Sequence, residues 1–185
     1  MTYSFMLTLP DWVGAFLAGE PKVFADLEHR MKLAITLSSL NVEHQTGGPF
    51  GAAIFDHSSG TLISAGVNLV VPGKCSLAHA EMVAIALAQK ALDTHDLGSR
   101  GTYQLITSCQ PCAMCLGAIP WSGVKSLVCG ARGEDAEAIG FDEGAKPVNW
   151  INELQKRGIE TTCDILRPQA AAILSRYHAQ GGTRY

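Results

Sequence analysis

Two short motifs of this chain carry residues that suit a catalytic metal. One is His-Ala-Glu at residues 79–81 and the other is Pro-Cys-Ala-Met-Cys at residues 111–115. A catalytic zinc ion takes three protein ligands and keeps a fourth position for water. Because His79, Cys112 and Cys115 supply three such ligands, we predict that the chain binds Zn²⁺ at a catalytic site.

Glu81 is the only acidic residue within these motifs. Two thiolates cancel the formal charge of a zinc ion, which makes it a weaker Lewis acid than a site with three imidazoles. Water at such a site needs a base close by, and we expect Glu81 to be that base. The main alternative is a structural zinc site, which would need a fourth ligand and would leave Glu81 without a role.

Both motifs are expected at the start of a helix. Residues i and i+2 of a helix point about 200° apart, so His79 and Glu81 can approach one metal only where the chain enters the helix. The apolar, alanine-rich residues 82–89 then predict a buried helix. Cys112 and Cys115 share a helix face, and a helix N-terminus favours the thiolate that zinc requires.

The rest of the chain predicts alternating helices and strands. Expected helices cover residues 21–46, 79–89, 112–121, 149–158 and 168–179. Expected strands cover residues 52–55, 61–68, 103–107, 124–130 and 159–162, and the first two of them form a hairpin. A hairpin followed by strand–helix alternation predicts an α/β fold with a mixed sheet of about five strands flanked by helices.

Composition narrows the class of protein. The 185 residues have 47% hydrophobic and 17% charged content, which is typical of one globular domain. We expect no membrane contact, because no apolar run approaches the ~18–20 residues of a membrane span. We expect no nucleic-acid partner, because 14 basic residues face 17 acidic ones without a basic block. The remaining cysteines suit buried positions, and we see no signal peptide, so we expect a cytoplasmic protein.

The order of elements resembles the cytidine-deaminase-like superfamily, over roughly residues 21–165. H-x-E…P-C-x-x-C is the signature of zinc-dependent nucleobase deaminases. The resemblance implies a three-layer α/β/α fold, a Zn²⁺ cofactor and a homodimer. We divide the chain into an N-terminal extension (1–20), a zinc-dependent deaminase domain (21–167), and a C-terminal helix and tail (168–185).

Within this superfamily, residues 108–121 and 135–143 resemble small bacterial guanine deaminases. The second segment is the more discriminating, because tRNA adenosine deaminases share the cysteine motif but continue differently after the next strand. The resemblance therefore implies a hydrolase that acts on the C–N bond of a cyclic amidine. Guanine and water would give xanthine and ammonia.

The resemblance also implies which residues contact a nucleobase. Asn68 stands where the family places an amide that reads the purine, and Glu143 stands where guanine deaminases usually carry Asp. A second acid there would hold the exocyclic amine, with Asp142 as the neighbouring candidate. Further expected contacts are Phe50 as a stacking ring, the backbone of Ala80, Trp121 as a wall, and Tyr185 as a lid after a Gly-Gly hinge. Each of them also has an ordinary structural interpretation, as core, turn, surface loop or chain end.

Alternative functions remain at this point. A tRNA adenosine deaminase should show basic residues around the site, and a cytosine deaminase is a close neighbour in chemistry. A non-catalytic zinc-binding module would not need Glu81. If the site reads only the edge N=C(NH₂)–NH–C=O, an aminotriazine such as ammeline should be a slow second substrate.

Overall fold

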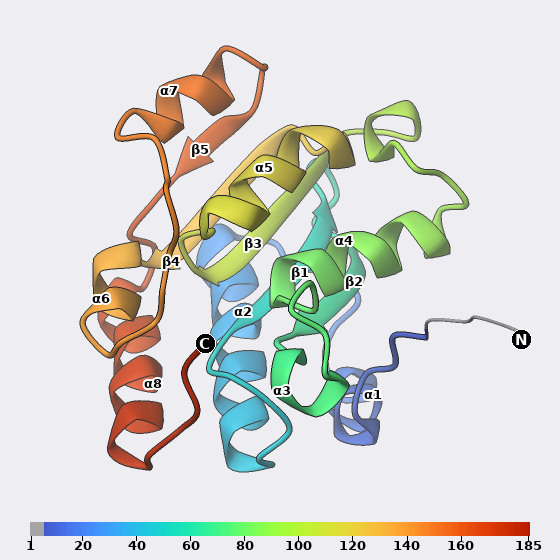
Figure 1. The fold of residues 1–185 in the computed structure, drawn as a ribbon. Coiled ribbons are helices and arrows are strands. Elements are labelled where there is room, and N and C mark those ends of the chain that lie inside the picture. Colours follow the sequence, from blue (N-terminus) through green and yellow to red (C-terminus); the bar gives the residue numbers. More distant parts are fainter. Residues whose placement is uncertain (1–5) are drawn as a thin grey trace, which may run out of the picture.

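A five-stranded mixed sheet forms the middle layer of the computed structural model, which describes residues 6–185 (Figure 1). The strands are β1 (Gly51–Asp56), β2 (Leu62–Val67), β3 (Tyr103–Cys109), β4 (Ser126–Ala131) and β5 (Glu160–Thr162). Their order is β2-β1-β3-β4-β5, with β1 antiparallel to β2 and β3, and β4 parallel to β3 and β5. This confirms the predicted mixed sheet and its leading hairpin.

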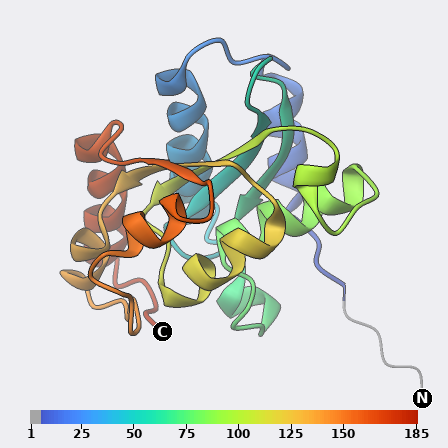
Figure 2. The same cartoon turned by 90° about the horizontal axis from the view of Figure 1, so that it is seen from above.

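Helices cover both faces of the sheet. Helices α2 (Leu27–Glu43) and α8 (Arg167–Ala179) pack on one face, while α4 (Ala80–Ala91) and α5 (Ala113–Ser122) lie on the other (Figure 2). The expected three-layer α/β/α fold is thus confirmed. The shorter helices are α1 (Asp11–Ala18), α3 (Val70–Gly73), α6 (Gly133–Glu137), α7 (Trp150–Gln155) and a 3₁₀ turn (Leu97–Ser99).

The alternation of side chains along β1 separates two hydrophobic cores. Ala53 and Phe55 are buried against the α2 side of the sheet, whereas Ala52 and Ile54 are buried against the α4 side. Successive side chains of a strand point to opposite faces, so a strand that is apolar throughout must be covered on both sides. The sheet is therefore a fixed central frame for the elements that start at its edges.

The first long helix begins later than its sequence pattern predicted. We expected it from Pro21, but α2 starts at Leu27, where Asp26 accepts a hydrogen bond from the His29 amide at 2.8 Å. This is a typical N-cap. The preceding residues are extended, and Val23 forms an isolated bridge with Thr61 of the hairpin.

Both ends of the described chain pack onto the sheet layers. Val13 of α1 is fully buried, and Trp12 donates a hydrogen bond from its indole to Thr46. At the other end, Leu174 and Tyr177 of α8 are buried in the same core. The expected N-terminal extension therefore contains a helix, although residues 1–5 lie outside the described part. No helix in the described part is long and apolar enough to cross a membrane.

Candidate active site

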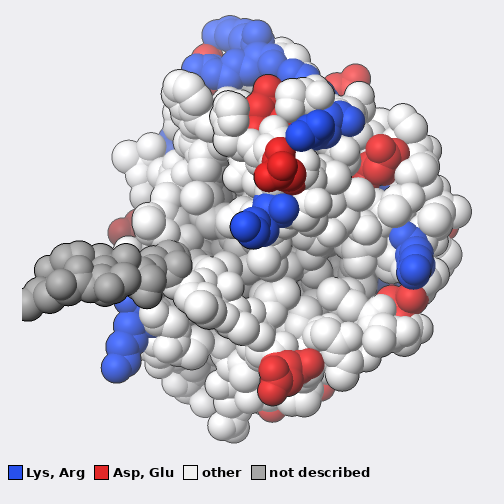
Figure 3. Space-filling view, turned by 90° about the vertical axis from the view of Figure 1, so that its right-hand side faces the viewer, with Lys and Arg blue, Asp and Glu red and all other residues white. Residues whose placement is uncertain are grey.

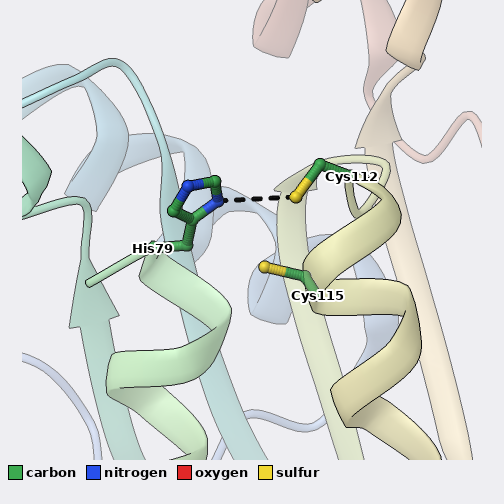
Figure 4. A group of neighbouring side chains, drawn as sticks. All are labelled: His79, Cys112 and Cys115. Atoms are coloured by element: carbon green, nitrogen blue, oxygen red, sulfur yellow. Dashed lines mark hydrogen bonds between the residues drawn. The ribbon is translucent and has the colours of Figure 1, made fainter. Parts of the chain in front are cut away.

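The expected zinc ligands meet where two helices start on the same face of the sheet. His79 is the N-cap of α4 and Cys112 is the N-cap of α5, while Cys115 lies in the first turn of α5 (Figure 4). Their ligand atoms lie within 4.8 Å of one another, and 3.6 Å separates His79 Nδ1 from Cys112 Sγ. The prediction that both motifs stand at helix starts is confirmed.

The spacing of these donor atoms fits a zinc ion. Zn–N bonds of about 2.0–2.1 Å and Zn–S bonds of about 2.3 Å at a tetrahedral angle place N and S about 3.6 Å apart. The distance between His79 and Cys112 has this value. His79, Cys112 and Cys115 would thus hold the metal and leave one coordination position for another group.

The electrostatics at the cysteines favour a metal ligand. Hydrogen bonds from Cys115 and His79 lower the pKa of the Cys112 thiol to about 4, although burial opposes this. The same hydrogen bond, together with burial, raises the pKa of Cys115. Burial lowers the pKa of His79, but the Cys112 hydrogen bond and Glu81 outweigh it, so the net shift is upward.

Glu81 lies in the first turn of α4, directly beside the three ligands. Its side chain is buried, and burial raises the pKa of its carboxyl group. The imidazole of His79 and the thiol of Cys115 oppose this effect and lower the pKa. A buried carboxyl whose pKa is raised is better suited to take up and give back a proton than a solvated one.

Glu143 approaches the same cavity from the loop after α6. It is 6% exposed, and burial raises the pKa of its carboxyl group to about 7. Its carbonyl oxygen accepts a hydrogen bond from the Ala113 amide at 2.8 Å, which joins the loop to the start of α5. Asp142 also borders the cavity, but it is exposed and accepts a hydrogen bond from Gly144 in a turn.

The remaining cavity between these groups is small, about 30 Å³. It is lined by Phe50, His79, Glu81, Gln110, Cys112, Phe141, Asp142, Glu143 and Tyr185. Gln110 and Phe141 were not among the expected site residues. Gln110 adjoins the cysteine motif and accepts a hydrogen bond from Gly133. The ring of Phe141 packs edge-on against that of Phe50, with 4.9 Å between the ring centroids. Phe141 belongs to residues 135–143, the segment that resembles guanine deaminases.

Tyr185 fills much of the space next to the zinc ligands. Its ring centroid lies 6.0 Å from that of His79 and 5.4 Å from that of Phe141. Its hydroxyl lies against the side chain of Asn68. Both the hydroxyl and Asn68 Oδ1 lie close to Gly48, where a Cβ atom would meet them. The space left open suits about one or two water molecules. The C-terminal tail is therefore folded over the site.

Asn68 is buried at the end of the hairpin, as a reading group for a base requires. Its Nδ2 makes no hydrogen bond that satisfies usual geometry within residues 6–185, while its Oδ1 accepts one from Val70 at 3.3 Å. A buried amide donor that meets only the Tyr185 hydroxyl suits a ligand that displaces the tail and brings an acceptor. Ala80 is the first residue of α4, where a backbone N–H has no partner inside the helix.

Trp121, which we expected to wall the pocket, does not line the cavity of its own chain. Trp121 is 85% exposed and borders a different groove of about 690 Å³ between α5 and α7. Trp121 lies nine positions after Cys112, and a rise of about 1.5 Å per residue carries it about 13.5 Å along the helix. Position after the motif therefore did not imply closeness to the metal.

Comparisons with known proteins agree with this geometry. The family model for the zinc-binding region of cytidine and deoxycytidylate deaminases matches residues 25–131. The guanine deaminase of Bacillus subtilis is 42% identical over 149 residues, which are 80% of this chain and 90% of that protein. A solved structure of the guanine deaminase from Nitrosomonas europaea is 49% identical, covers 97% of this chain and 98% of that chain, and has a TM-score of 0.91. Another structure, 49% identical with a TM-score of 0.92, is a complex with 2,6-diaminopurine and covers 98% of this chain and 96% of that chain.

Proposed function

Because the chain belongs to the cytidine and deoxycytidylate deaminase family, we propose that the described site hydrolyses guanine to xanthine and ammonia. The chain is a small zinc-dependent guanine deaminase of this superfamily. The observation that carries the proposal is the pair of buried acids, Glu81 and Glu143, which line one cavity with His79 and Cys112. A non-catalytic zinc module has no use for such a pair.

Hydrolysis of guanine requires two proton movements, and the two acids suit them. Glu81 takes a proton from the attacking water and gives it to a ring nitrogen next to the reacting carbon. Once the hydroxyl has added to the carbon, Glu81 passes its remaining proton to the exocyclic amine, which Glu143 holds by accepting a hydrogen bond. The C–N bond then breaks, the C=O bond forms, and ammonia leaves. Zinc bound to the three ligands supplies the Lewis acidity that makes water a nucleophile near neutral pH.

Three further residues hold the base in this proposal. The free Nδ2 donor of Asn68 binds an acceptor on the edge of the base. Phe50 offers a ring to stack on the base, and Phe141 supports that ring edge-on. Because the cavity beside Tyr185 is far smaller than a purine, the tail must move before guanine enters.

A substrate panel tests the proposed function. The zinc-loaded protein is incubated with guanine, cytosine, adenosine and a tRNA anticodon stem, and ammonia is measured together with the product. We expect rapid formation of xanthine from guanine and little ammonia from the others. Deamination confined to the tRNA stem would instead identify an RNA-editing enzyme, and full zinc without any turnover would indicate a binding module.

Ammeline belongs in the same panel. It carries the N=C(NH₂)–NH–C=O unit of guanine on a six-membered ring, but it lacks the imidazole part. It should bind more weakly and be deaminated slowly, because it presents the same reacting carbon with less stacking area. Adenine should react little, because its amine stands where guanine has its carbonyl. An ammeline rate equal to that of adenine would show that the local edge is not what the site reads.

We also propose a homodimer that uses the groove between α5 and α7. The groove is mainly apolar, and the exposed Trp121 stands at its edge. Val148, beside the groove, is also fully exposed. Lys125, Glu153 and Arg157 bring both signs of charge to the groove, so a two-fold contact could pair them. A projecting aromatic ring beside an apolar groove suits a second copy of the same chain.

The expected cytoplasmic location remains a proposal with one structural support. The six cysteines within residues 6–185 form no disulfide, as a reducing compartment favours. A small-molecule substrate fits the surface charge, because on the face in Figure 3 small groups of both signs stand between broad uncharged areas.

A further inference from the structure

Lys146 places a partly buried ammonium group directly behind the acid Glu143. Its side chain is only 15% exposed, and Nζ lies 3.5 Å from Glu143 Oε2. Nζ also donates a hydrogen bond to the carbonyl oxygen of Pro111 at 3.2 Å, one residue before the zinc ligand Cys112. The ring of Trp150 lies 5.7 Å from the same nitrogen.

This arrangement is too specific for an ordinary surface lysine. A buried ammonium is unfavourable unless it is paired and hydrogen-bonded. Here a carboxylate, a carbonyl oxygen and an aromatic face each approach Nζ. Gly133 adds to the fit, because a Cβ at that position would stand 2.9 Å from Nζ and 3.4 Å from Glu143 Oε2. The position is therefore shaped around both groups.

Glu143 depends on this neighbour. Its Oε2 is buried and makes no hydrogen bond of good geometry with the described residues. The ionic contact with Lys146 is therefore the interaction that offsets the burial of this oxygen. Without the ammonium group, the carboxylate would turn away or take up a proton, and it would no longer accept a hydrogen bond from an amine.

We propose that Lys146 is a positioning residue of the deaminase, which fixes the carboxylate of Glu143 toward the exocyclic amine of the substrate. This inference rests on the proposed function, because it assumes that Glu143 holds the leaving amine. Lys146 itself does not line the cavity and touches no reacting atom. Its second contact, with Pro111, is the rival explanation, because that contact could serve only to brace the start of α5.

A double-mutant cycle separates these two roles. The variants are Lys146→Met, Glu143→Gln and their combination, with Lys32→Met on the exposed side of α2 as the matched control. Lys146→Met should lower kcat/KM for guanine about 10- to 100-fold with zinc content unchanged, as loss of a partner behind a functional group typically does. In the Glu143→Gln background the same change should alter kcat/KM less than about twofold, because its target is already gone. Lys32→Met should keep wild-type values.

If Lys146→Met lowers kcat/KM by the same factor in the wild-type and the Glu143→Gln backgrounds, Lys146 does not act through Glu143 and the proposal is overturned. Loss of zinc from Lys146→Met would also overturn it, in favour of a role in bracing α5. If Lys146→Met does not fold, Lys146→Gln serves as the second variant, because it removes the charge and retains a hydrogen-bond donor. Wild-type turnover in Lys146→Gln would also overturn the proposal. If the wild-type chain does not act on guanine, the proposed function fails by itself. Crystal structures of the zinc-loaded wild type and variant then decide the rest, and an unmoved Glu143 carboxylate would reject the positioning role.

Discussion

Glu81 and Glu143 are buried acids of the same kind in two different surroundings. Both have a raised pKa because they are buried, but Glu81 lies beside the metal ligands and Glu143 lies beside an ammonium group. Different surroundings allow one residue type to serve two different roles in one reaction. We therefore expect the two acids to be unequal, with Glu81 moving protons and Glu143 holding the leaving amine.

Replacement of Glu81 by Gln should leave zinc binding intact and remove nearly all turnover. Glutamine keeps the shape of the side chain, but it cannot accept a proton from water, which costs about 10²–10⁴-fold in rate. Metal content and the rate of xanthine formation are to be measured on the same sample. Full zinc with wild-type turnover would exclude Glu81 as the base, and loss of zinc would make it a structural residue.

The individual site residues differ in how far the sequence could predict them. The ligand set was predictable because spacing within each motif fixes it, and the structure brings His79 and both cysteines together. Gln110 contacts Gly133, and Lys146 contacts Pro111. These partners are far apart in the sequence, so no local spacing predicts the contacts. Trp121 shows the opposite case, in which closeness along the chain was mistaken for closeness in space.

At the scale of elements, the loop that carries Glu143 is held from both sides. On one side, the Ala113 amide of α5 donates a hydrogen bond to the carbonyl oxygen of Glu143. On the other side, the loop follows α6 along the chain. Asp135 of α6 accepts a hydrogen bond from the Arg132 amide and forms a two-pronged ion pair with Arg167 at the start of α8. No local pattern in the sequence indicates this ion pair, because the partner of Asp135 lies 32 residues away along the chain.

Asp135→Asn should therefore loosen α6 and lower the free energy of unfolding by about 1–2 kcal/mol at pH 7, since hydrogen bonds to a charged group are lost. The hydrogen bonds from Arg167 hold the pKa of Asp135 below its ordinary value of 3.8, so its contribution is present above that value. It is lost as the pH falls through the lower pKa of the folded protein. Urea unfolding of both proteins from pH 7 to pH 3 measures this. A difference that is constant with pH would argue against the ion pair as the cause.

The C-terminal tail is the second element whose removal can be tested. Deletion of residues 181–185 removes Tyr185 from the site, so water and larger ligands gain access. We expect guanine turnover to fall and the exclusion of guanosine to relax, because a ribose would no longer meet the tail. The ratio of kcat/KM for guanine to that for guanosine is the measurement. If the truncated protein keeps the ratio of the intact one, the tail is not a lid.

At the scale of the whole molecule, the layered fold followed from the sequence. All five strands were predicted within a few residues. Apolar runs bounded by turns report β1, β3 and β4, which are buried along almost their whole length. The short helices α3 and α6 were not predicted, because four or five residues show no periodicity. Oligomerisation is even harder to predict from a sequence. The sequence alone does not show whether Trp121 is buried or exposed, and only the fold shows that it is exposed.

Trp121→Glu should prevent dimer formation. A carboxylate at the edge of the apolar groove would be desolvated by a second copy, which is unfavourable without a partner charge. Light scattering of the wild type at micromolar concentration should give twice the chain mass, and the variant should give a mass near the 19.7 kDa of one chain. Val23→Glu, at an exposed valine outside the groove, is the control that should remain dimeric. A wild type that is monomeric at this concentration would reject the dimer.

If the tail must leave the cavity before guanine enters, as proposed above, Tyr185 is also an intramolecular competitor of the substrate. Only the fraction of molecules whose tail has left the pocket can bind a base, so the apparent dissociation constant equals the intrinsic one divided by that fraction. The fraction is set by contacts that no substrate touches, such as the hydrogen bond from the Tyr177 hydroxyl to the Thr183 carbonyl at 2.8 Å. Gly182 belongs to the same balance, because a methyl group there would collide with the Tyr177 ring and push the tail outward. Affinity for guanine is thus adjustable from a segment remote from zinc, through the population of open molecules alone.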